Sequence, residues 1–189
     1  MEQLLVHKNK IIVVFVVLFL IVGLLFVSSS LKQDTNTTLS SPTPKSSLPA
    51  WNNFEPNESS YEEILSKLGQ PISESQDISN FKSSSATRNH QVYFKDRKAQ
   101  LIKQVVTAQD NLKTTYITNT YGQAPLVLYG EDAEDGMYLY VYSFSGVAFL
   151  GNLNTEDLRE IWYFQAVSNE EFKNLYAKDY STNFAPSGF

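Results

Sequence analysis

The chain has 189 residues, two histidines, no cysteine and a formal net charge of −5 at pH 7. The lack of cysteine excludes disulfides, thiolate nucleophiles, the usual zinc and iron–sulfur sites and a lipidated N-terminal cysteine, and we expect no cofactor. The negative charge argues against nucleic acid as a partner, because nucleic-acid sites depend on clustered cationic side chains.

Residues 11–27 form the first predicted element, an apolar run without a charged side chain. As a helix it would span about 26 Å at roughly 1.5 Å per residue, close to the hydrocarbon thickness of a bilayer. We therefore expect a single-pass transmembrane helix, with residues 1–10 as a cytoplasmic tail and the polar remainder outside the cytoplasm. The alternatives are a cleaved signal peptide and a buried helix of a soluble domain.

Residues 28–58 are rich in Ser, Thr, Asn and Pro. Such a composition buries too little apolar surface to offset the entropy of ordering, so it predicts a disordered, flexible linker. Trp51 and Phe54 either dock on the edge of the following domain or belong to a loose tail.

A folded domain is expected over residues 59–189, and a helix opens it. Ser60 and Glu63 have the spacing of a capping box, and Gly69 and Pro71 mark the end of the helix. A similar segment, residues 117–125, follows 53 residues later, with Gly122-Gln123 in the place of Gly69-Gln70.

Runs typical of strands follow each of these helices, and Ser168 with Glu171 opens a C-terminal helix. We therefore predict an α+β domain with an antiparallel sheet, built from two tandem α–β–β(–β) units over residues 60–112 and 113–167 and closed by a helix over 169–179. The alternative is that the shared Gly-Gln pair is a coincidence.

The helix that ends in Leu-Gly-Gln-Pro, followed by an antiparallel meander, resembles the BamE (SmpA/OmlA) lipoprotein domain. The resemblance rests on Tyr61–Pro71 with Gln91–Val106, and on Ile117–Pro125 with Met137–Phe164. It implies a small α/β sandwich in the cell envelope that acts as an accessory binding module and not as an enzyme. The chain departs from that family because a predicted transmembrane helix replaces the lipidated cysteine, which puts outer-membrane residence and a role in barrel assembly in doubt.

The densest acidic cluster precedes Gly136 and contains Asp132, Glu134 and Asp135. Carboxylates from one loop suit a hard cation such as Ca²⁺, so these three residues are a candidate weak cation site. Their spacing does not match an EF-hand loop, and a solvated acidic hairpin is the alternative.

His90 stands alone in the outer domain, because His7 precedes the apolar run. No nucleophile motif accompanies it, so we expect His90 to be a surface residue at the start of a strand and not a catalytic base.

Aromatic side chains recur at every second position from Tyr138 to Phe144. Period two places them on one face of a strand, and Leu139 and Val141 make the other face apolar as well. This pattern predicts a strand buried on both sides, whereas the functional alternative is an aromatic platform for a glycan or peptide.

Charge is divided along the domain, with a net +5 over residues 82–113 and −7 over 114–189. One interpretation is that the two segments complement each other within the molecule. The other is a basic patch that meets anionic polymers or lipid headgroups; its members would be Arg88, Lys95, Arg97, Lys98 and Lys103.

Together these features predict a non-catalytic interaction module, tethered to the bilayer by residues 11–27 and working with another envelope protein. A hydrolase that uses a pair of carboxylates is one alternative. A ligand-sensing ectodomain is another, although only ten residues precede the apolar run.

Overall fold

The computed structural model describes residues 50–184. The predicted cytoplasmic tail, the transmembrane helix over 11–27 and most of the predicted linker lie outside these residues. Within residues 50–184, no helix is both long and apolar enough to cross a bilayer.

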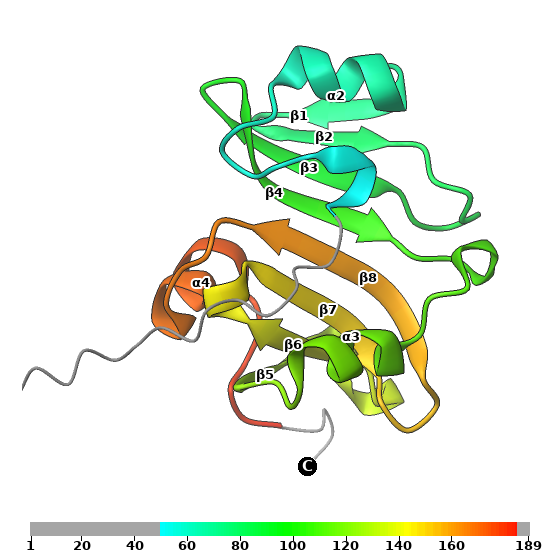
Figure 1. Cartoon of the computed structure of the whole chain (residues 1–189), viewed down its shortest axis with the longest axis vertical. Coiled ribbons are helices and arrows are strands. Elements are labelled where there is room, and N and C mark those ends of the chain that lie inside the picture. Colours follow the sequence, from blue (N-terminus) through cyan, green and yellow to red (C-terminus); the bar gives the residue numbers. More distant parts are fainter. Residues whose placement is uncertain (1–49, 185–189) are drawn as a thin grey trace, which may run out of the picture. The chain divides into compact units, whose positions relative to one another are not determined.

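The described residues form one eight-stranded antiparallel sheet in the order β1-β2-β3-β4-β8-β7-β6-β5 (Figure 1). The strands are β1 (Ser73–Ser75), β2 (Ile78–Phe81), β3 (His90–Lys95), β4 (Lys98–Val105), β5 (Leu126–Tyr129), β6 (Tyr138–Tyr142), β7 (Val147–Asn152) and β8 (Asp157–Phe164). The helices are α2 (Tyr61–Leu68), α3 (Thr114–Tyr121) and α4 (Asn169–Tyr176), with short 3₁₀ turns η1 (Trp51–Asn53), η2 (Ala108–Asp110), η3 (Glu131–Asp135) and η4 (Ser143–Ser145).

The predicted fold of two tandem α–β–β(–β) units is wrong, because a single sheet runs through both halves of the domain. β4 and β8 pair directly, from Leu101 opposite Phe164 to Val105 opposite Glu160. Each strand would otherwise be an edge with unpaired backbone groups, and their ladder satisfies these groups at the centre of the sheet. Strands β1 and β2 were not predicted, because their serine-rich segment is typical of a polar loop.

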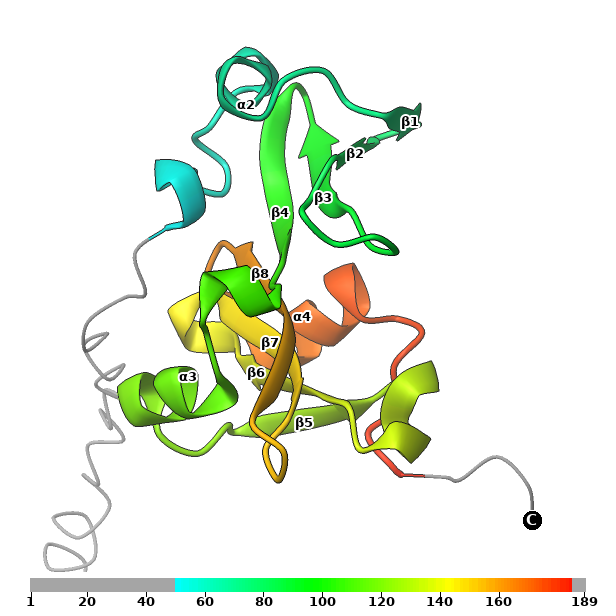
Figure 2. The same cartoon turned by 90° about the vertical axis from the view of Figure 1, so that its right-hand side faces the viewer.

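Two apolar layers cover the two faces of the sheet, and Figure 2 shows α2 and α3 on one side and α4 on the other. The α2/α3 face is built around Ile64, Ile117 and Phe149, all fully buried. The α4 face is built around Trp162 and Phe172. The first half of the sheet curves toward the α4 side (Figure 2).

β6 is buried on both sides, as its sequence predicts. Tyr140 and Tyr142 pack in the α2/α3 layer, whereas Leu139 and Val141 pack in the α4 layer. Phe144 does not continue this stripe, because the chain leaves the strand at η4 and the side chain is 59% exposed.

The folded domain begins earlier than predicted, so a linker that extends to residue 58 is wrong. The side chain of Phe54 is 1% exposed and belongs to the α2/α3 layer. The backbone N–H of Asn57 donates to the carbonyl of Ala99 at 2.6 Å. Trp51 and Phe54 bury apolar area that stabilises this segment on the domain. The average composition of residues 28–58 is polar, and it therefore gave no sign of this contact.

The cap of α4 agrees with the sequence, whereas the capping box predicted for α2 forms only in part, and the Glu63 carboxylate pairs with Lys67 instead. The Ser60 hydroxyl accepts a hydrogen bond from the backbone N–H of Glu63 at 3.2 Å, and Ser168 and Glu171 form a reciprocal capping box. α4 ends at Tyr176 and not at residue 179, because the following segment turns to pair with the edge of β5 through Ser181.

Candidate functional site

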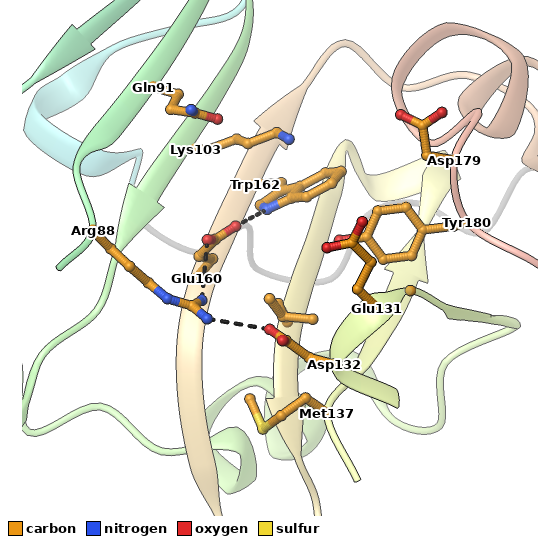
Figure 3. Close-up of a pocket in the computed structure, with 12 residues that line it drawn as sticks. Arg88, Gln91, Lys103, Glu131, Asp132, Met137, Glu160, Trp162, Asp179 and Tyr180 are labelled. Carbon is orange, nitrogen blue, oxygen red and sulfur yellow. Dashed lines mark hydrogen bonds and ion pairs between the residues drawn. The ribbon is translucent and has the colours of Figure 1, made fainter. Parts of the chain in front are cut away.

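A pocket of about 310 Å³ opens on the α4 face, where the first half of the sheet (β1–β4) meets the second half (β5–β8) (Figure 3). We call it the sheet pocket. Its lining residues are Arg88, Gln91, Lys103, Gly130, Glu131, Asp132, Met137, Leu150, Glu160, Trp162, Asp179 and Tyr180. A larger hollow of about 470 Å³ lies beside the ends of β4 and β8, but no aromatic side chain lines it. Aromatic rings together with charged groups therefore make the sheet pocket the better ligand site.

Arg88 ties the first half of the sheet to the second at the edge of this pocket. It lies between β2 and β3, and its guanidinium reaches Asp132 Oδ2 at 3.2 Å and Glu160 Oε1 at 3.4 Å (Figure 3). Asp132 also pairs with Arg159 at 3.3 Å. Both carboxylates are therefore engaged by the protein itself.

Trp162 forms the floor of the sheet pocket and is held by Glu160. Its Nε1–H donates to Glu160 Oε2 at 2.8 Å, and period two places both side chains on the α4 face of β8 (Figure 3). The ring is only 1% exposed, because Lys103 and Tyr180 cover it.

Lys103 projects from β4 over this ring. Its Nζ lies 3.7 Å from the centroid of Trp162 and 5.2 Å from that of Tyr93, which are cation–π distances. Burial lowers the pKa of Lys103, while the nearby charges of Glu160 and Asp179 act in the opposite direction. Within residues 50–184 the ammonium makes no hydrogen bond and no ion pair, and Lys103 lines the sheet pocket.

The far wall contains Tyr180, Asp179 and Glu131. The Tyr180 ring stands edge-on to Trp162, with centroids 5.9 Å apart. Burial, helped by the charge of Glu160, raises the pKa of Tyr180 to about 12, so its hydroxyl stays protonated at neutral pH. Asp179 and Glu131 are exposed and carry no ion pair or hydrogen bond to another described residue.

The predicted cation site does not form a metal-binding cluster. Asp132, Glu134 and Asp135 lie in η3, and Asp132 is already paired with Arg88 and Arg159. In the described part of the chain, no three histidine, aspartate or glutamate side chains are placed to hold a metal ion together.

His90 is not the free surface residue that the sequence predicts. It is half-buried, its Nδ1 accepts the backbone N–H of Val105 at 3.0 Å, and its ring lies 4.3 Å from that of Trp51. Burial lowers its pKa. The imidazole therefore holds η1 and β4 in place on the α2/α3 face, away from the sheet pocket.

The five cationic residues of the predicted basic patch are divided between the sheet pocket and the β3–β4 hairpin, where Lys95 lies opposite Lys98 in the ladder. Arg88 and Lys103 belong to the sheet pocket, Arg97 pairs with Glu62, and Lys98 donates to the carbonyl of Glu58. The contacts of Arg88 favour charge complementarity within the molecule, since both its partners come from the acidic second half.

The sequence interpretation missed Glu160, Trp162 and Tyr180. The spacing of Glu160 and Trp162 on one face of a predicted strand was a usable signal, because a carboxylate beside a buried indole N–H is a natural partner for it. Tyr180 gave no such signal, since it lies beyond the last predicted helix.

Comparisons with known proteins do not assign the chain to a family. No family model matches it, and no curated protein matches it significantly. A search of solved structures finds a DUF4309 family protein (YjgB) from Bacillus subtilis subsp. subtilis str. 168, at 12% identity over 58% of this chain and 81% of that one. The TM-score of 0.40 is too low to support an argument about fold or function. None of these comparisons tests the resemblance to the BamE family.

Proposed function

We propose that this chain is a non-catalytic binding module, tethered to the cell membrane by residues 11–27, and that its domain takes a ligand outside the cytoplasm in the sheet pocket. The apolar run and the polar linker that follows it support the tether. The pocket supports the binding role, since it gathers aromatic and charged side chains from both halves of the sheet.

One observation carries the non-catalytic assignment: two of the four pocket carboxylates, Asp132 and Glu160, are engaged by the protein itself. Arg88 holds Asp132 and Glu160 together, and Trp162 occupies a second oxygen of Glu160. Carboxylates fixed in this way stiffen a recognition surface, whereas a hydrolase needs two carboxyl groups free to exchange protons or attack substrate.

The tether is tested by fractionating cells that express the full-length chain. We expect the protein to stay in the membrane pellet through an alkaline carbonate wash, and protease applied to intact cells or spheroplasts to digest its C-terminal domain. A soluble full-length species, or a domain that protease spares, would overturn the membrane assignment.

The binding role is tested by NMR, because the chain has two tryptophans in different places. Trp162 lies in the sheet pocket, and Trp51 lies on the opposite face beside His90. With soluble peptidoglycan fragments as the probe, we expect the indole signal of Trp162 to shift, that of Trp51 to stay, and the fragments to remain intact. Equal shifts of both signals would refute the pocket as the binding site.

A carboxylate-dependent hydrolase is the second candidate, and one observation favours it: four acidic side chains line the same pocket. Glu131 and Asp179 make no hydrogen bond or ion pair with residues 50–184 and would be the reactive pair. Chromatography of the same fragments after long incubation decides between the candidates. If the wild-type chain cleaves the fragments and the Glu131→Gln and Asp179→Asn variants do not, the hydrolase assignment replaces the binding assignment.

A further inference from the structure

We propose that the ligand of the sheet pocket is a neutral saccharide. This inference rests on the proposed function, since it requires that the sheet pocket is a ligand site. Three features of the pocket support it: hydrogen-bonding groups that the protein leaves unused, the net charge of the lining and a partly exposed aromatic ring.

The sheet pocket presents unused donors and unused acceptors side by side. The Lys103 ammonium rests on the Trp162 ring and makes no hydrogen bond or ion pair with a described residue, and the same lack of hydrogen bonds and ion pairs holds for the carboxylates of Asp179 and Glu131. Figure 3 shows these side chains bordering the same hollow. A hydroxyl group both donates and accepts, so neighbouring hydroxyls of one sugar ring can meet the ammonium and the carboxylates together.

The charges of the lining exclude simpler ligands. Two cationic side chains face four carboxylates, a formal net charge of −2 that repels an anion. A cation would meet Lys103 at the centre of the floor, where the ammonium already covers the Trp162 ring. An apolar ligand would bury these charged groups without hydrogen bonds, which is costly. A neutral, hydroxyl-rich ligand avoids all three penalties.

Aromatic rings supply the apolar contact that a sugar ring also needs. Tyr180 stands on the far wall, and its ring is partly exposed; Tyr93 lies next to Lys103 but does not line the pocket. Trp162 lies beneath them and is fixed through its bond to Glu160. The C–H faces of a pyranose can pack on such rings while its hydroxyls reach the charged groups.

The test is calorimetric titration of the full-length chain, purified in a non-ionic detergent, with a matched charge series. The probes are N-acetylglucosamine and its trimer, which are neutral, glucosamine, which is cationic, and glucuronate, which is anionic. We expect the neutral sugars to bind most tightly, with the charged sugars at least about threefold weaker. We also expect little change in the affinity of the neutral sugars with ionic strength, because no net ligand charge is screened.

Lys103→Met tests the central contact, since it keeps the length of the side chain and removes the donors. Loss of hydrogen bonds from a charged group predicts about a tenfold weaker affinity for the trimer. Lys95→Met is the matched control, because Lys95 is exposed at the end of β3 and does not line the pocket. Asp179→Asn is a second variant at an exposed position, and we expect it to weaken binding without altering the melting temperature.

The outcomes separate the two proposals. If glucosamine or glucuronate binds in the pocket more tightly than the neutral sugars, the pocket remains a ligand site and the saccharide assignment is wrong. If the neutral sugars bind equally well to Lys103→Met, the assignment is also wrong. If no probe of any charge binds the wild-type chain and peptidoglycan fragments leave Trp162 unchanged, both the saccharide assignment and the proposed function fail.

Discussion

Replacing Phe54 by alanine tests whether the folded domain begins before residue 59. The ring is 1% exposed, packs edge-on against Trp51 at 5.8 Å, and has the Lys67 ammonium 5.0 Å from its centroid. Truncation of a buried phenylalanine costs about 3–5 kcal/mol through lost transfer energy and the cavity that remains. In a domain of this size such a loss lowers the melting temperature on the order of 10 °C.

The assay is thermal unfolding of the full-length chain, followed by near-ultraviolet circular dichroism, with Phe144→Ala as the matched control. Phe144 is 59% exposed, so its truncation is expected to change stability by less than about 0.5 kcal/mol. If Phe54→Ala melts within a degree or two of Phe144→Ala, residues 50–58 do not pack as described, and the reasoning about the start of the domain is refuted.

Three further predictions concern single backbone and side-chain features. Gly146→Ala should destabilise the fold by at least about 2 kcal/mol in denaturant titration, because φ is +68° and the new Cβ would lie 2.3 Å from the Phe164 carbonyl oxygen; an unchanged midpoint would contradict that geometry. Ser168→Ala should cost about 1 kcal/mol by the same titration through loss of the α4 cap, and Ser168→Asp should restore most of it. Since burial lowers the pKa of His90, the unfolded chain takes up its proton first, so stability should fall as the pH drops below 6.5, the ordinary value, and level off below the folded pKa. Unfolding titrations of His90→Gln across this range should lack that decline, and a decline of equal size would show that His90 is not its source.

The sequence predicts local features of this fold well. Ser60 and Ser168 mark the starts of α2 and α4, because the hydroxyl of an N-cap residue bonds to a backbone N–H only three residues further on. The reciprocal side-chain bond of a capping box is present at α4. The two apolar faces of β6 follow from the alternation of Tyr140 and Tyr142 with Leu139 and Val141, since adjacent residues of a strand point to opposite faces.

Pairing between distant segments is what the sequence does not reveal. Nothing in residues 98–105 marks their partner as residues 157–164, and the polar strand β1 has no side chain that needs burial. The candidate site depends on the same kind of contact. Arg88 meets Asp132 and Glu160 only because the central ladder brings the two halves together, and no local spacing encodes that meeting.

The β4–β8 ladder also determines when this domain can finish folding during synthesis. β4 is complete at Val105, but its central partner begins only at Asp157, so a nascent chain shorter than this carries a strand whose hydrogen-bonding edge is open. A long sequence separation of this kind slows folding, because much chain entropy must be lost before the central strands meet. A polypeptide that ends before Asp157 would therefore expose an unpaired strand edge that can pair with other chains and aggregate. The N-terminal half alone is for this reason a poor candidate for independent expression.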